Sequence, residues 1–136
     1  MALRLSTGLR NALLGTNGWK GLMSGGKLTI WTGGQPASAD YAETGSKLAE
    51  LTATFGTAAD GSIPVLASWS GTVAVAGIAG WFRLYGTAGT TGSSATEVRL
   101  DGNCGVSGAD LNFTNSSLRL GAALTCDEFT ITEPAS

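Results

Sequence analysis

Side chains that commonly perform acid–base or nucleophilic catalysis are scarce in this chain. It contains no histidine, which excludes Ser-His-Asp and Cys-His arrangements and removes the commonest general base near neutral pH. Hydrolysis would have to use lysine or a carboxylate pair, and the candidate pairs are Asp40 with Glu43 and Asp127 with Glu128. Their spacing fits no known metal-ligand loop. We therefore interpret these acids as solvated loop residues, and we expect no catalytic site, no metal site and no cofactor.

Two cysteines and a glycine-rich run are the remaining candidates for a site. Cys104 and Cys126, in a chain without histidine, cannot complete the four-ligand shell of a structural zinc. We expect them to be buried small side chains, and a disulfide between them is the alternative. Residues 102–108 (GNCGVSG) lack the dinucleotide fingerprint, and no Gly-Lys-Ser/Thr follows them. This run therefore predicts turns rather than a phosphate-binding loop.

The weak charge of the chain limits the partners that it could bind. Charged residues make up 13% of its 136 residues, against roughly 25% in soluble domains, and the formal net charge is -2. No excess of basic residues is present to bind a phosphate backbone. The first residues lack the pattern of a signal peptide, and no apolar stretch approaches the ~20 residues of a membrane span. We expect one soluble domain, made in a cytosol, with no nucleic-acid partner and no membrane partner.

Residues 1–24 are predicted to form an N-terminal amphipathic arm and a connector. Leu5, Leu9 and Leu13 recur every four residues, which predicts a helix, and a glycine soon after ends it. Gly8 weakens this helix by up to ~1 kcal/mol relative to alanine, so the segment needs a surface to pack against. Two interpretations are open: the helix caps the core of its own domain, or it is an arm that docks on a neighbouring subunit.

From residue 25 onward the sequence changes to short β-type runs separated by turns rich in Gly, Ser, Thr and Asn. Short strands in close succession, with no helical period between them, favour antiparallel pairing. We therefore predict a mainly β protein in which residues 25–136 form one antiparallel, jelly-roll-like β-sandwich, preceded by the short N-terminal helical arm. The expected strands are 27–31, 46–54, 63–69, 71–76, 80–85, 95–101, 110–114, 118–120 and 128–132, and 33–45 is an expected loop.

The run 80–85 (GWFRLY) carries large side chains on both faces. Trp81, Arg83 and Tyr85 lie on one side of the predicted strand, and the intervening residues lie on the other. This pattern is typical of a central strand with one face on the core and the other against a partner or the N-terminal helix. We expect all four tryptophans to anchor packing rather than to bind a ligand.

The amphipathic arm and the large strand residues suit assembly with other protein chains. Interfaces take most of their energy from a few buried aromatic and arginine anchors. We assign partner binding to two groups of residues on this basis. They are Leu5, Leu9, Arg10 and Leu13 in the arm, and Trp31, Trp81, Arg83 and Tyr85 in the strands.

Most of the chain is similar to known virion proteins. The start MALRLSTGLRNALL, residues 28–51 (LTIWTGGQPASADYAETGSKLAEL) and two strings within residues 80–111 (GWFRLYG and EVRLDGNCGVSGADL) resemble small structural proteins encoded by tailed phages and prophages. The resemblance implies a non-enzymatic virion component: a capsid decoration (cement) protein or, alternatively, a neck or tail accessory protein of the connector or ring type. It also implies assembly in the bacterial host cytoplasm, a homo-oligomer, and binding to the major capsid protein or other virion proteins.

Two alternatives come from other functional classes. In a carbohydrate-binding β-sandwich, exposed tryptophans such as Trp31 or Trp69 would stack on sugar rings. In an enzyme, the carboxylate pairs named above would supply the acid and the base. Exposed tryptophans flanked by acids or amides would favour the first alternative.

Overall fold

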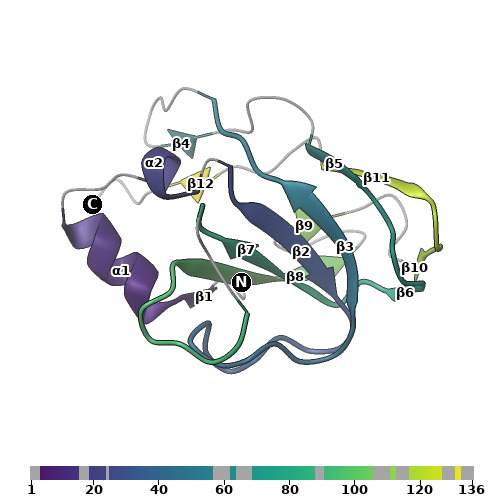
Figure 1. Cartoon of the computed structure of the whole chain (residues 1–136), viewed down its shortest axis with the longest axis horizontal. Helices are drawn as coiled ribbons and strands as arrows, with labels where there is room; N and C mark the ends of the chain where they lie inside the picture. The colour runs from purple at the N-terminus through teal and green to yellow at the C-terminus, as the bar shows by residue number, and fades with distance from the viewer. Residues whose placement is uncertain are drawn as a thin grey trace.

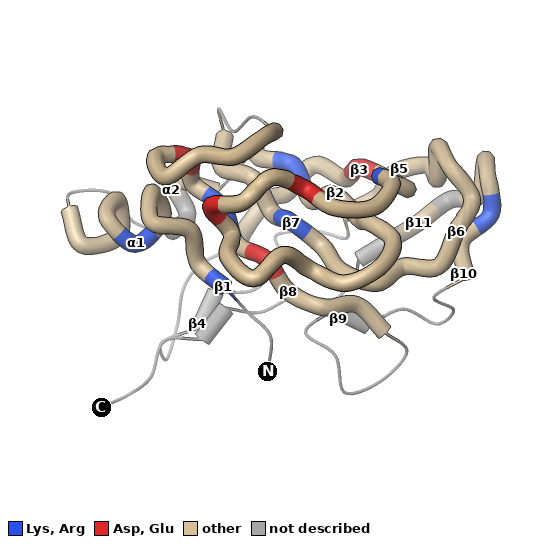
Figure 2. The backbone as a smooth tube through the Cα atoms, turned by 90° about the horizontal axis from the view of Figure 1, so that it is seen from below, with Lys and Arg blue, Asp and Glu red and all other residues tan. Residues whose placement is uncertain are grey.

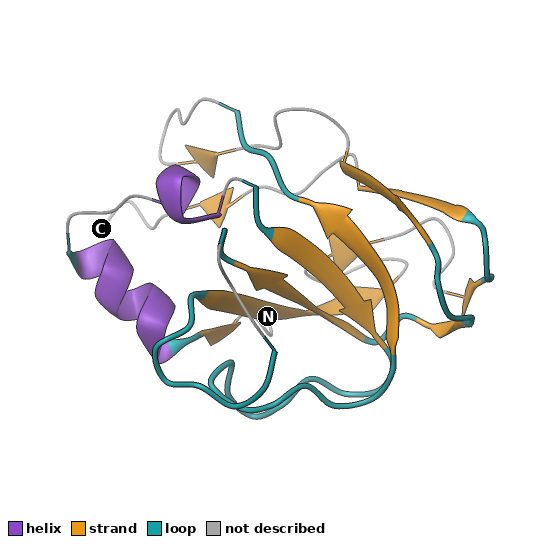
Figure 3. Ribbon diagram, in the orientation of Figure 1, coloured by secondary structure: helices purple, strands orange, loops and turns teal. Residues whose placement is uncertain are grey.

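Antiparallel strand pairs dominate the structure, and two short helices lie near the N-terminus (Figures 1 and 3). The computed structural model describes residues 4–15, 19–23, 25–56, 62–63, 69–87, 91–105, 111–112, 117–126 and 131–132. The helices are α1 (Thr7–Leu14) and α2 (Trp19–Met23). The strands are β1 (Arg4–Leu5), β2 (Lys27–Trp31), β3 (Lys47–Thr52), β4 (Ser62–Ile63), β5 (Trp69–Thr72), β6 (Gly77–Ile78), β7 (Trp81–Tyr85), β8 (Arg99–Gly105), β9 (Leu111–Asn112), β10 (Ser117–Leu118), β11 (Ala123–Cys126) and β12 (Ile131–Thr132). The mainly β class with a short N-terminal helix is confirmed, and the jelly-roll topology stays a prediction.

The largest sheet has the strand order β1-β8-β7-β2-β3, and β9 pairs with β8 in parallel. Successive side chains of a strand point to opposite faces, so the register decides which residues share a face. Leu28 pairs with Leu84, and both belong to the apolar core. Thr29 and Arg83, one residue away on each strand, also pair and lie outside that core cluster. The sheet therefore has one apolar face and one polar face.

A single apolar cluster covers the apolar face of this sheet. It collects side chains from both helices, the sheet and the strands beyond β3, so distant parts of the chain share it. Burying one large apolar side chain of this kind stabilises a fold by about 1.5–3 kcal/mol. The members are Leu9, Met23, Leu28, Ile30, Leu48, Ala49, Leu51, Ala53, Phe55, Trp69, Val73, Ala79, Phe82, Leu84, Leu100, Leu118 and Leu124.

Residues 69–78 and 117–126 run side by side as a two-stranded ribbon beyond β3 (Figure 1). The β5–β11 and β6–β10 ladders have the same register, and hydrogen bonds at Val73 connect them. Its N–H donates to the carbonyl of Ala122 at 2.9 Å, and its carbonyl accepts from the N–H of Gly121 at 2.8 Å. We call this element the ribbon. One side of it packs on the apolar core through Leu118 and Leu124.

The N-terminal segment is built into the same domain. β1 pairs with β8 at the edge of the main sheet, and the hydroxyl of Ser6 caps α1 by accepting from the N–H of Leu9 at 3.1 Å. Leu9 is fully buried in the core, and Leu13 packs against it. Of the two interpretations of this helix, the structure shows the one in which it caps its own core. Leu9 is therefore not accessible to a partner, contrary to our assignment.

Local chemistry explains where the observed strands differ from the expected ones. β2 spans the predicted residues, but residues 95–98 are not a strand, and β8 instead runs to Gly105. The Ser94 hydroxyl accepts from the N–H groups of Thr96 and Glu97 at 3.2 Å, which holds a turn there. The expected connector contains α2. The expected strands at 63–69, 110–114 and 128–132 fall partly outside the described residues.

Replacing Gly8 by alanine is expected to destabilise the protein, although alanine is the better helix former. A Cβ at this position would lie 2.3 Å from the carbonyl oxygen of Thr96 and 2.5 Å from that of Glu97, so the helix would have to move away from the turn that precedes β8. We expect a loss of about 2 kcal/mol in the free energy of unfolding, measured by urea denaturation. The matched control is Gly21→Ala in α2, where no described atom lies within 4 Å, and it should be neutral or stabilising by up to ~1 kcal/mol. Equal effects of the two substitutions would contradict this account.

Candidate functional site

A loop of the protein itself covers the polar face of the main sheet. The loop between β2 and β3, residues 32–46, is called the covering loop here (Figure 3). Its backbone carbonyls accept from the side chains beneath it: Tyr41 from Arg83 at 2.9 Å, and Thr44 from Trp81 at 3.3 Å. Acidic and basic positions consequently come together around β7 and β8 (Figure 2).

This arrangement corrects our assignment of the β7 side chains to partner binding. Trp81, Arg83 and Tyr85 are all buried, and Trp31 is 9% exposed. The sequence correctly separates the two faces of β7, but the second face packs under the covering loop rather than against a partner or the N-terminal helix. A loop between adjacent strands can fold back over its own sheet, and nothing in the strand pattern indicates this.

An ion pair between Arg83 and Asp101 lies at the centre of the covered face. The Nε and Nη2 atoms of Arg83 donate to the two carboxylate oxygens of Asp101 at 2.7 and 2.8 Å, and both side chains are completely buried. Burial lowers the pKa of Arg83, but the hydrogen bonds and charge of Asp101 outweigh it and raise that pKa. Burial raises the pKa of Asp101, and the hydrogen bonds and charge of Arg83 oppose that change. The bidentate geometry fixes the register of β7 on β8.

Glu43 connects the covering loop to this pair. Its carboxylate lies 3.2 Å from Arg83 Nη1, accepts from the Tyr85 hydroxyl, and accepts from the N–H of Gly92 at 2.8 Å. Burial raises the pKa of Glu43, but these hydrogen bonds and the charge of Arg83 together hold it below the usual value. Burial, and next the hydrogen bond to Glu43, raise the pKa of Tyr85. Our interpretation of Glu43 as a solvated loop acid is therefore wrong.

Asp40 connects the covering loop to helix α1. Its two carboxylate oxygens accept from the backbone N–H of Thr7 at 2.7 Å and from the hydroxyl of Thr7 at 2.5 Å. The hydrogen bond from the hydroxyl does most to lower the pKa of Asp40, partly offset by desolvation. A carboxylate at the first turn of a helix is also stabilised by the helix dipole. Asp40 therefore also has a structural role, because it holds the covering loop against the start of α1. The other predicted pair, Asp127 and Glu128, lies outside the described residues.

Aromatic rings complete the covered layer. Trp31 and Trp81 stack with their centroids 5.7 Å apart, and the guanidinium of Arg83 lies 5.3 Å from the Trp81 ring centroid. Within the apolar core, Phe55 packs edge-on against Trp69, with the ring centroids 5.2 Å apart. Trp31 and Trp69 are 9% and 2% exposed, so neither offers the flat exposed surface on which a sugar ring would stack.

The carboxylates of the covered layer are engaged in contacts within the fold. Within it, each carboxylate oxygen of Asp101 and Glu43 already accepts a hydrogen bond from the protein. Among the described residues, no group of three or more His, Cys, Asp or Glu side chains is placed to hold a metal ion. The side chain of Cys126 lies outside the described part of the chain, so nothing tests the alternative of a disulfide with Cys104.

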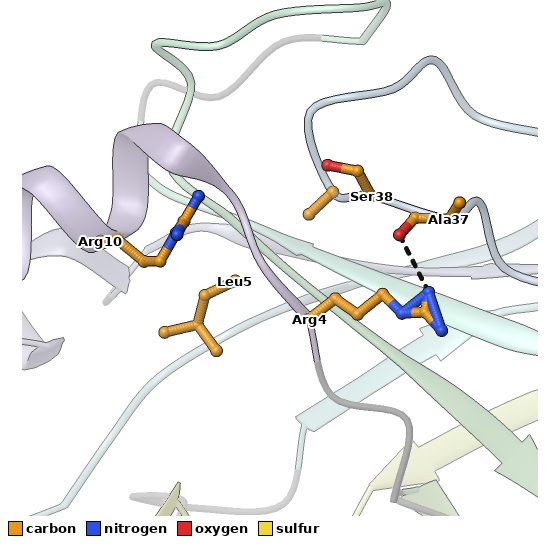
Figure 4. Close-up of a pocket in the computed structure, with 6 residues that line it drawn as sticks. Arg4, Leu5, Arg10, Ala37 and Ser38 are labelled. Atoms are coloured by element: carbon orange, nitrogen blue, oxygen red, sulfur yellow. Dashed lines mark hydrogen bonds between the residues drawn. The ribbon is translucent and has the colours of Figure 1, made fainter.

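Two of the predicted binding residues line an open pocket at the N-terminal end of the fold. The pocket has a volume of about 340 Å³. Leu5 lies between Arg4 and Arg10, and the covering loop forms the opposite wall (Figure 4). The lining residues are Arg4, Leu5, Arg10, Ala37, Ser38 and Ala39. The sequence indicates Leu5 and Arg10 through the amphipathic pattern, but the wall from residues 37–39 depends on where the covering loop folds.

Disrupting the Arg83–Asp101 pair should show that the two charges depend on each other. Asp101→Leu leaves the buried guanidinium short of a counter-ion and should cost about 3–5 kcal/mol in the free energy of unfolding. Adding Arg83→Met removes the unpaired charge while Glu43 keeps its bonds from Tyr85 and Gly92, so the double variant should be more stable than Asp101→Leu alone. Chemical denaturation of the wild type and the three variants gives the coupling energy. Additive losses would contradict a coupled pair.

The bond from Thr7 to Asp40 should stabilise the protein only while the carboxylate is ionised. The folded-state pKa of Asp40 is lowered, so its contribution is present above the ordinary value of 3.8 and is lost as the pH falls through the lower folded value. Asp40→Asn should cost about 1 kcal/mol near neutral pH, and the difference from wild type should shrink in acid. Urea denaturation across pH measures it. Glu50→Gln, at the exposed pair with Lys47, is the control, with an expected loss below about 0.5 kcal/mol. A difference for Asp40→Asn that stays constant down to strongly acidic pH would rule out this origin.

Comparisons with known proteins found no relationship on which a function could be based. No protein-family model matches the chain, no curated protein matches it, and no solved structure matches its fold. Within the part of the chain that is described, neither helix has the length and apolar character needed to cross a bilayer. The geometry of the covered layer, the pocket and the exposed surface is therefore the structural basis for a functional proposal.

Proposed function

We propose that the chain is a non-enzymatic structural protein of a tailed-phage virion, and specifically a capsid decoration protein that binds and stabilises the assembled head. The sequence resemblance supports the virion assignment, and the low charge suits a protein that packs against other proteins. The structural observation that carries the binding role is a group of three exposed apolar side chains on the ribbon, Val75, Ile78 and Leu120, which we call the ribbon patch.

The ribbon carries these three side chains near the point where its two ladders meet. Ile78 pairs with Ser117 in the β6–β10 ladder. Val75 lies in the bend between β5 and β6, and Leu120 lies in the turn between β10 and β11, which the N–H of Ala122 closes by donating to the carbonyl of Arg119 at 3.0 Å. The three residues are 46%, 66% and 70% exposed, respectively. Grouped exposed apolar residues of this kind are typical of a surface that binds another protein.

The patch is suited to weak contacts that are repeated many times. Burying one such side chain fully contributes about 1.5–3 kcal/mol, so three of them give modest affinity after the cost of association. A coat protein present in many copies does not need strong single contacts, because neighbouring contacts add avidity. The ribbon itself is anchored in the core through Leu118 and Leu124, which fixes the exposed side chains in place.

A neck or tail accessory role is the alternative within the same class. A ring subunit and a decoration subunit can share one β fold, so copy number distinguishes them. Hundreds of copies per purified particle, counted by quantitative mass spectrometry, would support the capsid role, whereas the small number of a ring would support the neck or tail. The carbohydrate-binding alternative was based on Trp31 and Trp69, and both side chains are buried.

Polar substitutions in the ribbon patch should weaken attachment to particles. We expect Ile78→Ser with Leu120→Ser to reduce the protein retained on purified particles by about tenfold or more, since most of the apolar contact is lost. The matched control is Leu14→Ser, at the exposed end of α1, which is 87% exposed and lies away from the ribbon (Figure 1). Retention is measured by sedimentation and quantitative immunoblotting.

Unchanged retention of the double variant would contradict the role of the patch, provided that its unfolding curve matches that of the wild type. Absence of the wild-type chain from purified particles would contradict the virion assignment itself. Deleting residues 1–15 is a less specific test than these surface substitutions, because it removes Leu9 from the core and β1 from the sheet.

A further inference from the structure

The pocket between β1, α1 and the covering loop gathers two arginines in a chain that has few basic residues. Lysine and arginine together number eight in the whole sequence. Arg83 and Arg99 are buried under the covering loop, and Lys47 pairs with Glu50 on the surface. Lys27 and Arg119 are exposed elsewhere on the surface, whereas the exposed Arg4 and Arg10 both line this one pocket.

Each guanidinium is held in place through one nitrogen, and its other nitrogens stay available to bind a ligand. Arg4 donates through Nη1 to the carbonyl oxygens of Pro36 and Ala37 at 3.3 and 3.0 Å. Arg10 donates through Nη2 to the hydroxyl of Thr7 at 3.1 Å. Among the described residues, neither arginine has a carboxylate within 4.0 Å. The guanidinium groups are therefore oriented by neutral oxygens, and their charges have no partner in an ion pair within the described structure.

Asp40, the nearest acid, does not form an ion pair with either arginine. Asp40 is close enough to Arg10 for the arginine charge to contribute to the lowering of its pKa. Both carboxylate oxygens of Asp40, however, already accept hydrogen bonds from Thr7. The charge of the buried Arg99 also lowers the pKa of this carboxylate. The pocket therefore keeps a positive character at its rim.

The shape and chemistry of the pocket favour a peptide over a lone anion. Leu5, which is 40% exposed, lies between the two arginines, with Ala37 and Ser38 opposite (Figure 4). An apolar floor between two separated cations fits a chain whose carboxylates flank small or apolar side chains. The net charge of -2 leaves no broad cationic surface that would favour nucleic acid instead.

We propose that this pocket binds an acidic, extended segment of a neighbouring virion protein, with Arg4 and Arg10 each contacting a carboxylate and Leu5 packing between them. This inference rests on the proposed structural role, and it adds a second contact at the opposite end of the molecule from the ribbon (Figure 1). Attachment at both ends would let one copy bridge two neighbouring subunits.

The binding test uses the full chain and a defined probe. A fluorescein-labelled peptide of alternating glutamate and alanine is titrated with protein, and fluorescence anisotropy reports binding. Arg4→Gln and Arg10→Gln should each weaken binding by about threefold to fivefold, and added salt should weaken wild-type binding. Arg10→Lys keeps the charge but loses the planar fork, so it should lie between wild type and Arg10→Gln.

Two controls decide whether the pocket itself is responsible. Arg119→Gln makes the same charge change beside β10, at the far end of the molecule from α1, and should leave peptide binding unchanged (Figure 1). A peptide with glutamine in place of glutamate should not bind. Binding to Arg4→Gln and Arg10→Gln that equals wild-type binding would overturn the proposal, as would no binding to the wild type.

A competition experiment distinguishes an acidic segment from a small anion. Inorganic phosphate or free glutamate at matched ionic strength should not displace the labelled peptide, and displacement at comparable concentrations would show a general anion site and overturn the proposal. These results are independent of the particle assays. Loss of peptide binding in the arginine variants would support the pocket even if the chain were absent from virions, and the ribbon variants test the virion role separately.

Discussion

The buried pair of Arg83 and Asp101 is the interaction on which the rest of the architecture depends. A guanidinium and a carboxylate can be taken out of water only if their geometry is good and their remaining donors are satisfied. The bidentate contact meets the first requirement. The second requires a cover, because the third guanidinium nitrogen needs acceptors above the sheet. Glu43 and the carbonyl of Tyr41 supply them, and both belong to the covering loop.

The covering loop also connects parts of the chain that are distant in sequence. From the covering loop, Asp40 reaches the start of α1, and Glu43 reaches Gly92 in the loop before β8. The polar network therefore fixes the position of the N-terminal helix as well as the register of the central strands. Replacing such a network with apolar residues often costs little stability. We infer that its value here is a single defined placement of the covering loop, which forms one wall of the arginine pocket.

Because Trp31, Trp81, Arg83 and Tyr85 are buried beneath the covering loop, the two proposed binding surfaces use other residues. The ribbon presents apolar side chains at one end, and the pocket presents arginines at the other. These surfaces differ in chemistry: contacts at the ribbon would be insensitive to salt, whereas contacts at the pocket would weaken as salt is added. A protein that spans two neighbours in a coat benefits from having both kinds, since each restricts which neighbour can be bound.

The sequence alone determined the features that depend on local periodicity: the β class, strand β2, the two faces of β7 and the short N-terminal helix that contains Leu9 and Leu13. It could not show that the covering loop folds over Arg83, or that residues 69–78 run beside residues 117–126, because both depend on contacts between segments far apart in the chain. Burial of the β7 face was missed for the same reason. An alternating strand looks the same whether its second face meets a partner or the protein's own loop, and only the tertiary structure decides which side chains remain to bind anything else.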